Sequence, residues 1–360
     1  MLISEKLYLL EKYCIAEQLT QRERIEKIRE FGSIEAFADH LPEEIDFSAR
    51  DAKIMERLQA FDTRLIGIDD PAYPALLREI SNPPAWLYLR TGMTDTELMT
   101  VQPETHCLSI VGTRRPTPYG LQVTERLLQR LRDREVTVVS GLALGIDSAT
   151  HRQALTEDIP TWAFLPCGID RIYPTRHAGL ADNITRSKRG MIWSEFAPGS
   201  PPRRQHFPAR NRLISGVSAH TVVVEAGARS GSAITAGFAA DQGREVWAVP
   251  GSVYMRMSAG CLDLIRDGAR VLTDAEELCE NFPYRQTPRE NDFTGDRSRL
   301  PSETTVKVTE REILSYIGAA EPDSDRLIRL LKRSDIDAYR FLADRQMDGT
   351  IERRFGRWYL

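Results

Sequence analysis

Four arginines and a phenylalanine lie close together in one segment of the chain, residues 200–216. The segment also holds His206, and its arginines are Arg203, Arg204, Arg210 and Arg212. Guanidinium groups neutralise phosphates, and an aromatic ring such as Phe207 can stack on a nucleobase, a combination typical of single-strand nucleic-acid binding. The segment therefore predicts a polyanionic ligand. The alternative for Phe207 is a structural role, in which its ring only anchors the loop to the core.

The charge around this segment is one-sided. Residues 171–224 contain nine Lys or Arg and two acids, which gives +7 within a chain whose formal net charge is −4. No acidic residue occurs between Glu195 and Glu225. Solvated protein faces usually interleave both signs, so an ordinary solvated face fits this stretch less well than an anion-binding surface. The net charge of the whole chain does not by itself indicate such a ligand.

Glycine-containing loops are the second feature that could do chemistry. They contain, in chain order, Gly112-Thr113-Arg114, Gly141-Leu142 and Ser230-Gly231-Ser232. Each loop is expected to enter a helix, whose free amides and positive dipole end attract anions. Arg114 can offer a planar fork to a phosphate. The loops lack the G-x-G-x-x-G and G-x-x-x-x-G-K-[ST] patterns and any carboxylate cluster suited to Mg²⁺, so we expect no dinucleotide, no P-loop chemistry, no metal and no cofactor.

Six short apolar segments predict the strands that position these loops. Each is apolar on both faces, as buried parallel strands are. The segments are 107–111, 136–139, 161–165, 191–193, 222–224 and 245–249. Helical stretches separate them, for example 119–133, with an apolar stripe of Leu121, Leu127, Leu128 and Leu131. The alternation predicts an α/β fold, an extended Rossmann-like parallel sheet with helices on both faces and ligands beyond the carboxyl ends of its strands. Upstream, residues 85–90 predict an edge strand.

Two residues of catalytic type stand near the predicted loops, His151 and Cys167. His151 lies one turn into the helix after the Gly141 loop, where a histidine packed beneath the loop is favoured over a general base. Cys167 follows the third strand and has no obvious base to activate its thiol. The sequence therefore predicts a binding protein rather than an enzyme.

Composition and cysteine usage exclude several other classes of protein. The chain has 360 residues, 41% hydrophobic and 28% charged, which indicates a multidomain globular protein. Its five cysteines form no C-x-x-C pair, so we expect neither disulfides nor a zinc site, in keeping with a reducing cytoplasm. The start of the chain has no apolar signal region, and the longest charge-free run is 12 residues, 213–224. We therefore expect no membrane contact.

The chain divides into four predicted parts. Residues 1–62 show helical spacing, and the step Phe31-Gly32-Ser33 predicts a helix stop followed by a Ser N-cap. Residues 63–282 hold the α/β core. Residues 283–304 are polar and predict a flexible linker. Residues 305–360 predict three helices and a terminal β-hairpin, the winged-helix layout.

In this order and spacing, the motifs make the chain similar to the DNA processing protein A family, also called DprA or Smf. The likeness covers residues 70–283 best. The segments that carry it are Tyr73-Pro74-Ala75-Leu76-Leu77, Pro83-Pro84-Ala85-Trp86-Leu87-Tyr88, Val111-Gly112-Thr113-Arg114 with Tyr119-Gly120, Ser140-Gly141-Leu142-Ala143-Leu144-Gly145-Ile146-Asp147 with His151, Cys167-Gly168 with Tyr173-Pro174, Phe207-Pro208 with Arg210-Asn211-Arg212, Val224-Glu225-Ala226 with Ser230-Gly231-Ser232, and Ala248-Val249-Pro250-Gly251-Ser252.

This resemblance implies a protein with no established catalytic activity that binds single-stranded DNA, dimerises and loads RecA recombinase during natural transformation. It also implies an amino-terminal module like a sterile alpha motif or a helix-hairpin-helix. The expected partners are single-stranded DNA, RecA and a second copy of the chain. The DNA-binding residues proposed on the motifs are Gly112, Thr113, Arg114, Gly141, Leu142, Arg204, Phe207, Arg210, Asn211, Arg212, Ser230, Gly231 and Ser232.

The chain departs from the family pattern at three positions. His177 and Leu262 stand where the family usually shows Asn, and Gln153 stands where it often shows Gly. These differences concern the fine shape of two loops and leave the predicted DNA-binding strip intact.

Two alternative functions stay open at this point. One is a nucleotide-binding or nucleotide-hydrolysing Rossmann-like enzyme, because the turn at residues 231–235 loosely resembles the glycine–threonine loop of phosphoribohydrolases. That turn lacks the preceding Gly-Gly pair and the following Glu of those enzymes. The other alternative is a protein-interaction scaffold, in which the basic loop is only a surface.

Overall fold

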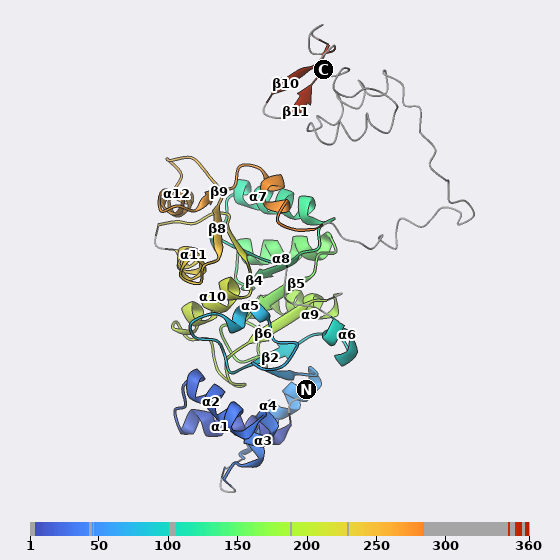
Figure 1. Cartoon of the computed structure of the whole chain (residues 1–360), viewed down its shortest axis with the longest axis vertical. Helices are drawn as coiled ribbons and strands as arrows, with labels where there is room; N and C mark the ends of the chain where they lie inside the picture. The colour runs from blue at the N-terminus through green and yellow to red at the C-terminus, as the bar shows by residue number, and fades with distance from the viewer. Residues whose placement is uncertain are drawn as a thin grey trace, which may run out of the picture. The chain divides into compact units, whose positions relative to one another are not determined.

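The structure is a computed structural model of the chain. It describes residues 4–42, 45, 47–100, 106–187, 189–228, 230–283, 345, 350–354 and 357–359. The chain divides into two compact units, Met1–Gln286 and Thr287–Leu360. Figure 1 shows the elements of both units and labels most of them.

Four helices open the first unit, and each begins at a hydroxyl N-cap that accepts a backbone N–H of its first turn. The N-caps are Ser4, Thr20, Ser33 and Ser48. The helices are α1 (Glu5–Ala16), α2 (Gln21–Phe31), α3 (Ile34–Asp39) and α4 (Ala49–Ala60). Gly32 ends α2 at φ 87°, a left-handed conformation that favours glycine. The predicted helix stop and Ser33 N-cap are confirmed.

A nine-stranded sheet forms the centre of the described part of this unit, in the order β1-β2-β6-β5-β4-β3-β7-β8-β9. The strands are β1 (Arg64–Gly67), β2 (Trp86–Arg90), β3 (Cys107–Val111), β4 (Thr137–Ser140), β5 (Thr161–Phe164), β6 (Met191–Ser194), β7 (His220–Val223), β8 (Glu245–Ala248) and β9 (Arg270–Val271). All neighbours from β6 to β9 are parallel, whereas β2 pairs antiparallel with both β1 and β6. The six predicted strands correspond to β3–β8. The prediction of an edge strand at 85–90 is wrong, because β1 covers the outer side of β2.

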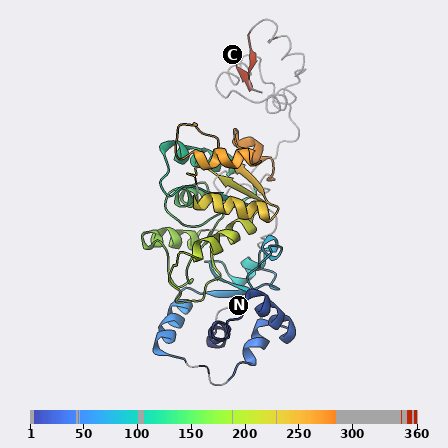
Figure 2. The same ribbon diagram turned by 90° about the vertical axis from the view of Figure 1, so that its left-hand side faces the viewer.

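The long helices between the parallel strands form two groups, as the return of the chain from β6 to β7 requires. One group contains α7 (Pro118–Leu131), α8 (Ile146–Thr156) and α9 (Ala178–Arg186), and the other contains α10 (His206–Gly216), α11 (Gly231–Asp241) and α12 (Ala259–Arg266). Figure 1 shows the two groups on opposite sides of the sheet, and Figure 2 views the molecule from the side of α11 and α12. Shorter elements are α5 (Ala75–Arg78), α6 (Asp95–Thr100), η1 (Thr175–His177) and α13 (Ala275–Cys279).

The core follows the predicted apolar stripe of α7 except at one position. Leu127, Leu128 and Leu131 are buried, whereas Leu121 is 43% exposed. Leu121 lies in the first turn of the helix. In this turn the buried residue is the neighbouring Gly120, which packs against the carboxylate of Glu225. The prediction that Leu121 belongs to the buried stripe is therefore wrong.

A buried glutamate joins the amino-terminal helices to the edge of the sheet. Glu11 of α1 accepts hydrogen bonds from Trp86 Nε1 at 2.7 Å and Tyr88 Oη at 2.9 Å, both on β2. Arg24 of α2 donates to the other carboxylate oxygen at 3.1 Å. Because all these groups are buried, each needs its partner. The helical module and the sheet are thus linked by a polar network as well as by apolar contacts.

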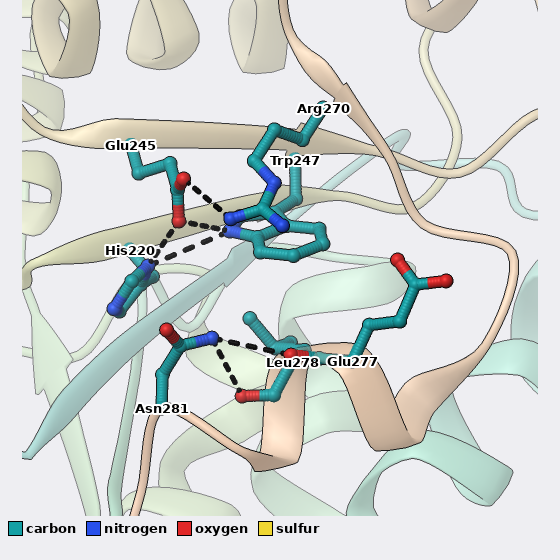
Figure 3. Close-up of polar contacts among 7 residues, drawn as sticks. All are labelled: His220, Glu245, Trp247, Arg270, Glu277, Leu278 and Asn281. Atoms are coloured by element: carbon teal, nitrogen blue, oxygen red, sulfur yellow. Dashed lines mark hydrogen bonds and ion pairs between the residues drawn. The ribbon is translucent and has the colours of Figure 1, made fainter.

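The amino ends of β7, β8 and β9 are joined by a surface cluster, which Figure 3 shows. Glu245 accepts hydrogen bonds from His220 at 2.9 Å, Trp247 Nε1 at 3.0 Å and Arg270 at 2.8 Å. The Arg270 guanidinium also lies 4.0 Å from the centroid of the Trp247 ring. Next to it, Asn281 donates to two carbonyls of α13. These contacts tie the amino ends of the three strands together.

The described residues of the second unit include a β-hairpin, β10 (Glu352–Arg354) and β11 (Arg357–Tyr359), paired antiparallel. The three helices predicted for residues 305–360 lie outside the described residues, so the winged-helix layout stays a prediction. Among the described residues, no helix is long and apolar enough to span a membrane.

Candidate nucleic-acid interface

The order of the strands places a crevice beside the carboxyl end of β3. From β3 the chain proceeds through α7 to β4 on one side, while β7 pairs with β3 on the other side. At such a switch point the two connections lead away from each other and leave a gap that ligands occupy. A cavity of about 380 Å³ lies there, lined by Val111, Gly112, Thr113, Arg114, Ala143, Asp147, Phe207, Arg210, Asn211, Ile214, Ser230, Gly231, Ser232 and Thr235.

The loop after β3 packs closely against the helix that follows β4. A Cβ on Gly112 would lie 2.6 Å from Cγ1 of Ile146, so only glycine fits there. The Ile146 N–H donates to the Thr113 carbonyl at 3.1 Å, and the Thr113 N–H donates to the Glu225 carbonyl at 2.7 Å. These bonds fix the backbone on both sides of the cavity. The exposed side chain of Arg114 follows directly and is held at the cavity mouth.

The loop after β4 contains a strained residue at its turn. Leu142 has φ 55°, a left-handed conformation that is costly for a branched side chain. Buried His177, at the end of η1, donates from Nδ1 to the Leu142 carbonyl at 2.8 Å. The histidine thus helps to hold the loop in a conformation that it would not adopt alone.

Arg210 is buried beneath the cavity and connects three segments. Its Nη1 donates to the carbonyls of Gly141 and Phe164, each at 2.6 Å. A Cβ on Gly141 would lie 2.5 Å from this nitrogen, so the glycine makes the close approach possible. Burial lowers the pKa of Arg210 to about 10, which leaves it charged at neutral pH. Arg210 lines the cavity, but its Nη1 already donates hydrogen bonds to two backbone carbonyls.

Asp147 is the carboxylate among the cavity-lining residues that the structure describes. It lies inside α8 and accepts a hydrogen bond from the Ala143 N–H at 3.4 Å. Burial raises its pKa, whereas the charges of Arg210 and Arg114 lower it. Asp147 therefore lies close enough to both arginines for their charges to act on it, and the exposed Arg114 supplies the positive charge at the mouth.

Phe207 lies between the cavity and a smaller pocket beside it. The Arg114 guanidinium carbon lies 5.1 Å from the centroid of the Phe207 ring. Tyr173, which is 40% exposed, meets the same ring edge-on at a centroid distance of 5.8 Å. Phe207 lines both spaces, and Tyr173 lines the smaller pocket. The ring is only partly buried, so it offers surface to a ligand.

The amino end of α11 forms the remaining wall of the cavity. Ser230 is the N-cap and accepts a hydrogen bond from the Ala233 N–H at 3.2 Å. Asn211 of α10 donates to the Gly231 carbonyl at 3.2 Å, which ties the two helices together. Gly231 is exposed, and no atom lies within 4 Å of where its Cβ would stand. The free amides of this helical turn therefore face a space that an anion can enter.

Comparison with known proteins agrees with this architecture. Residues 64–283 match the family described as DNA recombination-mediator protein A. The chain belongs to this family. It is 35% identical over 268 residues to the DNA processing protein DprA of Bacillus subtilis, covering 74% of this chain and 84% of the relative.

Two solved structures of the family resemble this one. The X-ray structure of DprA from Streptococcus pneumoniae has a TM-score of 0.61 and 32% identity, and the match covers 79% of this chain and 100% of that chain. A structure of DprA from Helicobacter pylori, described as giving insight into its single-stranded DNA binding mode, has a TM-score of 0.53 and 29% identity. That match covers 61% of this chain and 95% of the other. The α/β, Rossmann-like core expected for the family is confirmed.

The structure brings together most of the site residues that the family motifs suggested. Nine of them line the cavity: Gly112, Thr113, Arg114, Phe207, Arg210, Asn211, Ser230, Gly231 and Ser232. Gly141 lines the smaller pocket. Three lie outside both linings. Leu142 is buried, Arg204 is exposed, and Arg212 donates to the Asn82 carbonyl at 2.7 Å and to the carboxylate of buried Glu195.

The departures from the family pattern have ordinary structural roles. His177 holds the Leu142 carbonyl, as described above. Gln153 donates to Glu157 at 2.9 Å, one turn along α8. Leu262 lies in α12, where its N–H donates to the Ser258 carbonyl at 2.9 Å.

The two residues of catalytic type are buried and unreactive. His151 shares a hydrogen bond of 2.8 Å between its Nδ1 and Thr161 Oγ1, and burial lowers its pKa to about 3. Burial raises the pKa of Cys167 to about 12, which suppresses the thiolate. Both agree with structural roles. All five cysteines are buried and none forms a disulfide, and no group of three or more His, Cys, Asp or Glu in the described part of the chain could hold a metal ion.

Proposed function

We propose that the chain binds single-stranded DNA across the cavity at the carboxyl end of β3. The observation that carries this proposal is the placement of Arg114 against Phe207 at the cavity mouth, 5.1 Å apart. A cation beside a partly exposed ring offers phosphate neutralisation and base stacking to one nucleotide. The single-stranded DNA binding described for the Helicobacter pylori relative supports this proposal.

Each wall of the cavity has a part in this binding. The amino end of α11, with Ser230 and Gly231, receives a backbone phosphate through its amides. Arg114 neutralises the same phosphate or the next one, and Phe207 stacks on the base of the nucleotide that carries it. Arg210 acts from below, because it holds the Gly141 loop in place. Exposed Arg204 lies beyond the cavity and attracts the continuing strand.

The proposal is tested by titrating the protein with fluorescent oligo-dT and with a duplex of the same length. We expect the single strand to bind more tightly, because paired bases cannot reach Phe207. Binding of the duplex alone, or of neither, would contradict the proposal. Phe207→Leu keeps an apolar anchor without a ring and should lose part of the preference for the single strand.

We also propose the wider biology that the family resemblance implies. The chain protects incoming single strands, loads RecA and forms a homodimer during natural transformation, in the cytoplasm and without catalysis. Its parts are a helical module (1–62), the DNA-binding core (63–282), a linker (283–304) and a winged helix (305–360). Co-purification of RecA with DNA-bound protein, and the mass of the free protein in solution, test these partners.

The alternative function is hydrolysis of a nucleotide. One observation favours it, namely buried Asp147 with a raised pKa in the lining of the cavity. Against it stand the unreactive states of His151 and Cys167. Incubation with nucleoside monophosphates decides the matter, because release of free base by the wild-type protein but not by Asp147→Asn would establish the enzyme.

A further inference from the structure

The loop after β8 exposes three consecutive apolar side chains. Val253 is 75% exposed, Tyr254 is 93% exposed and Met255 is 52% exposed. Exposed apolar side chains that adjoin each other indicate a contact surface, since single ones are common but clusters are not. An aromatic ring that is almost wholly free has both faces open to a planar partner.

This loop is held in a defined conformation. The Met255 N–H donates to the Ser252 carbonyl at 3.0 Å, and the Ser258 N–H donates to the Met255 carbonyl at 3.0 Å. The Tyr254 N–H also donates to the Ser252 hydroxyl at 3.3 Å. The two turns fix the backbone under Tyr254. Because the backbone is already fixed, the loop loses less conformational entropy when a ligand binds.

The loop is attached to the walls of the cavity. The Ala226 N–H donates to the Met257 carbonyl at 2.8 Å, and the Thr113 hydroxyl contacts Met257 Sδ at 3.5 Å. Tyr119 Oη donates to the Pro250 carbonyl at 2.8 Å. Thr113 lines the cavity, so the loop continues the same surface.

The order of the strands sets the order of their loops along the carboxyl edge. The parallel strands run β5-β4-β3-β7-β8. Tyr173, beside Phe207, belongs to the loop after β5, the cavity opens beside β3 and β7, and Tyr254 belongs to the loop after β8. Strands are spaced about 4.8 Å apart, so this edge is roughly 20 Å long. It therefore has room for more than one nucleotide.

We propose that Tyr254 is a second base-stacking site, which binds the same single strand on the far side of the cavity from Phe207. This proposal rests on the proposed function. Exposed Arg256 adjoins Tyr254, and exposed Arg115 follows Arg114 on the neighbouring loop. No acidic residue occurs between Glu245 and Asp263. The surface around Tyr254 thus suits a polyanion, and a base on its ring would follow a phosphate bound at the cavity.

The experiment compares two oligo-dT lengths, about three and about twenty nucleotides, on the full-length protein, because at about 3.4 Å per nucleotide only the longer strand spans the whole edge. Tyr254→Ala should weaken binding of the longer strand about fivefold or more, the low end of a stacking contribution. It should leave the short strand nearly unaffected, since that strand can occupy the Phe207 side alone. Tyr254→Phe, the matched control, should bind both strands like the wild type. The salt dependence of Tyr254→Ala should not change, because no charge is lost.

A tryptophan at the same position gives a direct signal. Tyr254→Trp should show fluorescence quenching with the longer strand beyond that of the wild-type protein. Equal affinity of Tyr254→Ala and wild type for the longer strand, with no added quenching, would overturn the proposal. A change in the mass of the free protein without a change in DNA affinity would assign the loop to contact between copies of the chain and would likewise overturn it. If the wild type binds neither strand, the proposed function itself fails.

Discussion

The guanidinium carbon of Arg114 lies 5.1 Å from the ring centroid of Phe207. The two residues come from different elements, the loop after β3 and the first turn of α10. Their approach creates one place where a positive charge and an aromatic surface are offered together. The following variants test what individual arginines of the segment 200–216 contribute to stability.

Arg210→Ala should destabilise the fold more than it alters surface charge. Removal of the guanidinium leaves the buried carbonyls of Gly141 and Phe164 without their donor, at a cost of about 2 kcal/mol or more. Chemical denaturation should show this loss of unfolding free energy. Arg204→Ala removes an exposed arginine of the same segment and should change stability by less than about 0.5 kcal/mol. Equal stability of the two variants would contradict the assignment.

Arg212→Ala should be destabilising in a pH-dependent way. Arg212 pairs with Glu195, and burial raises the pKa of that carboxyl to about 7. Without Arg212 the buried carboxylate is unpaired, which costs about 3 kcal/mol at pH 8. Arg212 lowers that pKa, so in the variant it lies above 7, and the stability of the variant increases as the pH falls through this range and the carboxyl takes up a proton. The deficit measured by denaturation should therefore be smaller at pH 5.

The double variant Arg212→Met with Glu195→Gln serves as its control. It removes both charges, so most of the lost stability should return and the pH dependence should disappear. A deficit that is the same at both pH values and is not recovered by the double variant would show that the ion pair has no such role.

His177→Ala should weaken binding of single-stranded DNA about threefold to tenfold, since one hydrogen bond to the Leu142 carbonyl is lost. The strained residue at φ 55° then relaxes, and the loop beside the cavity moves with it. His177→Asn retains an N–H donor and should bind within about twofold of the wild type. Affinity is measured by fluorescence anisotropy with oligo-dT. If the alanine and asparagine variants bind equally, the histidine does not hold the loop.

Much of the fold could be predicted because its signals are local. The six strands β3–β8 are short apolar runs, and the stop at Gly32 followed by Ser33 is a local capping pattern. The edge position predicted for residues 85–90 is wrong because it depends on whether another strand pairs on the outer side, as β1 does. Helical spacing also predicts Leu121 in the core. In the structure its side chain is exposed, and the neighbouring Gly120 packs against Glu225 instead.

The site could be predicted as a set of residues but not as a set of roles. Residue type alone does not distinguish exposed Arg114 from buried Arg210, because the difference lies in carbonyls from distant strands. The ion pair of Arg212 with Glu195 could not be predicted, because the two residues are 17 positions apart and belong to different elements. The order of strands, which brings the loops together, carries information that no single motif contains.

The salt dependence of single-strand binding tests the central claim most directly. The affinity for oligo-dT is measured over a range of salt concentrations for the wild type, Arg114→Ala and Arg126→Ala, the last an exposed arginine on α7 outside the cavity. We predict that Arg114→Ala weakens binding and reduces the slope of log K against log salt by about 1, because one phosphate contact is lost. Arg126→Ala should match the wild type. An unchanged affinity and slope for Arg114→Ala would contradict the account.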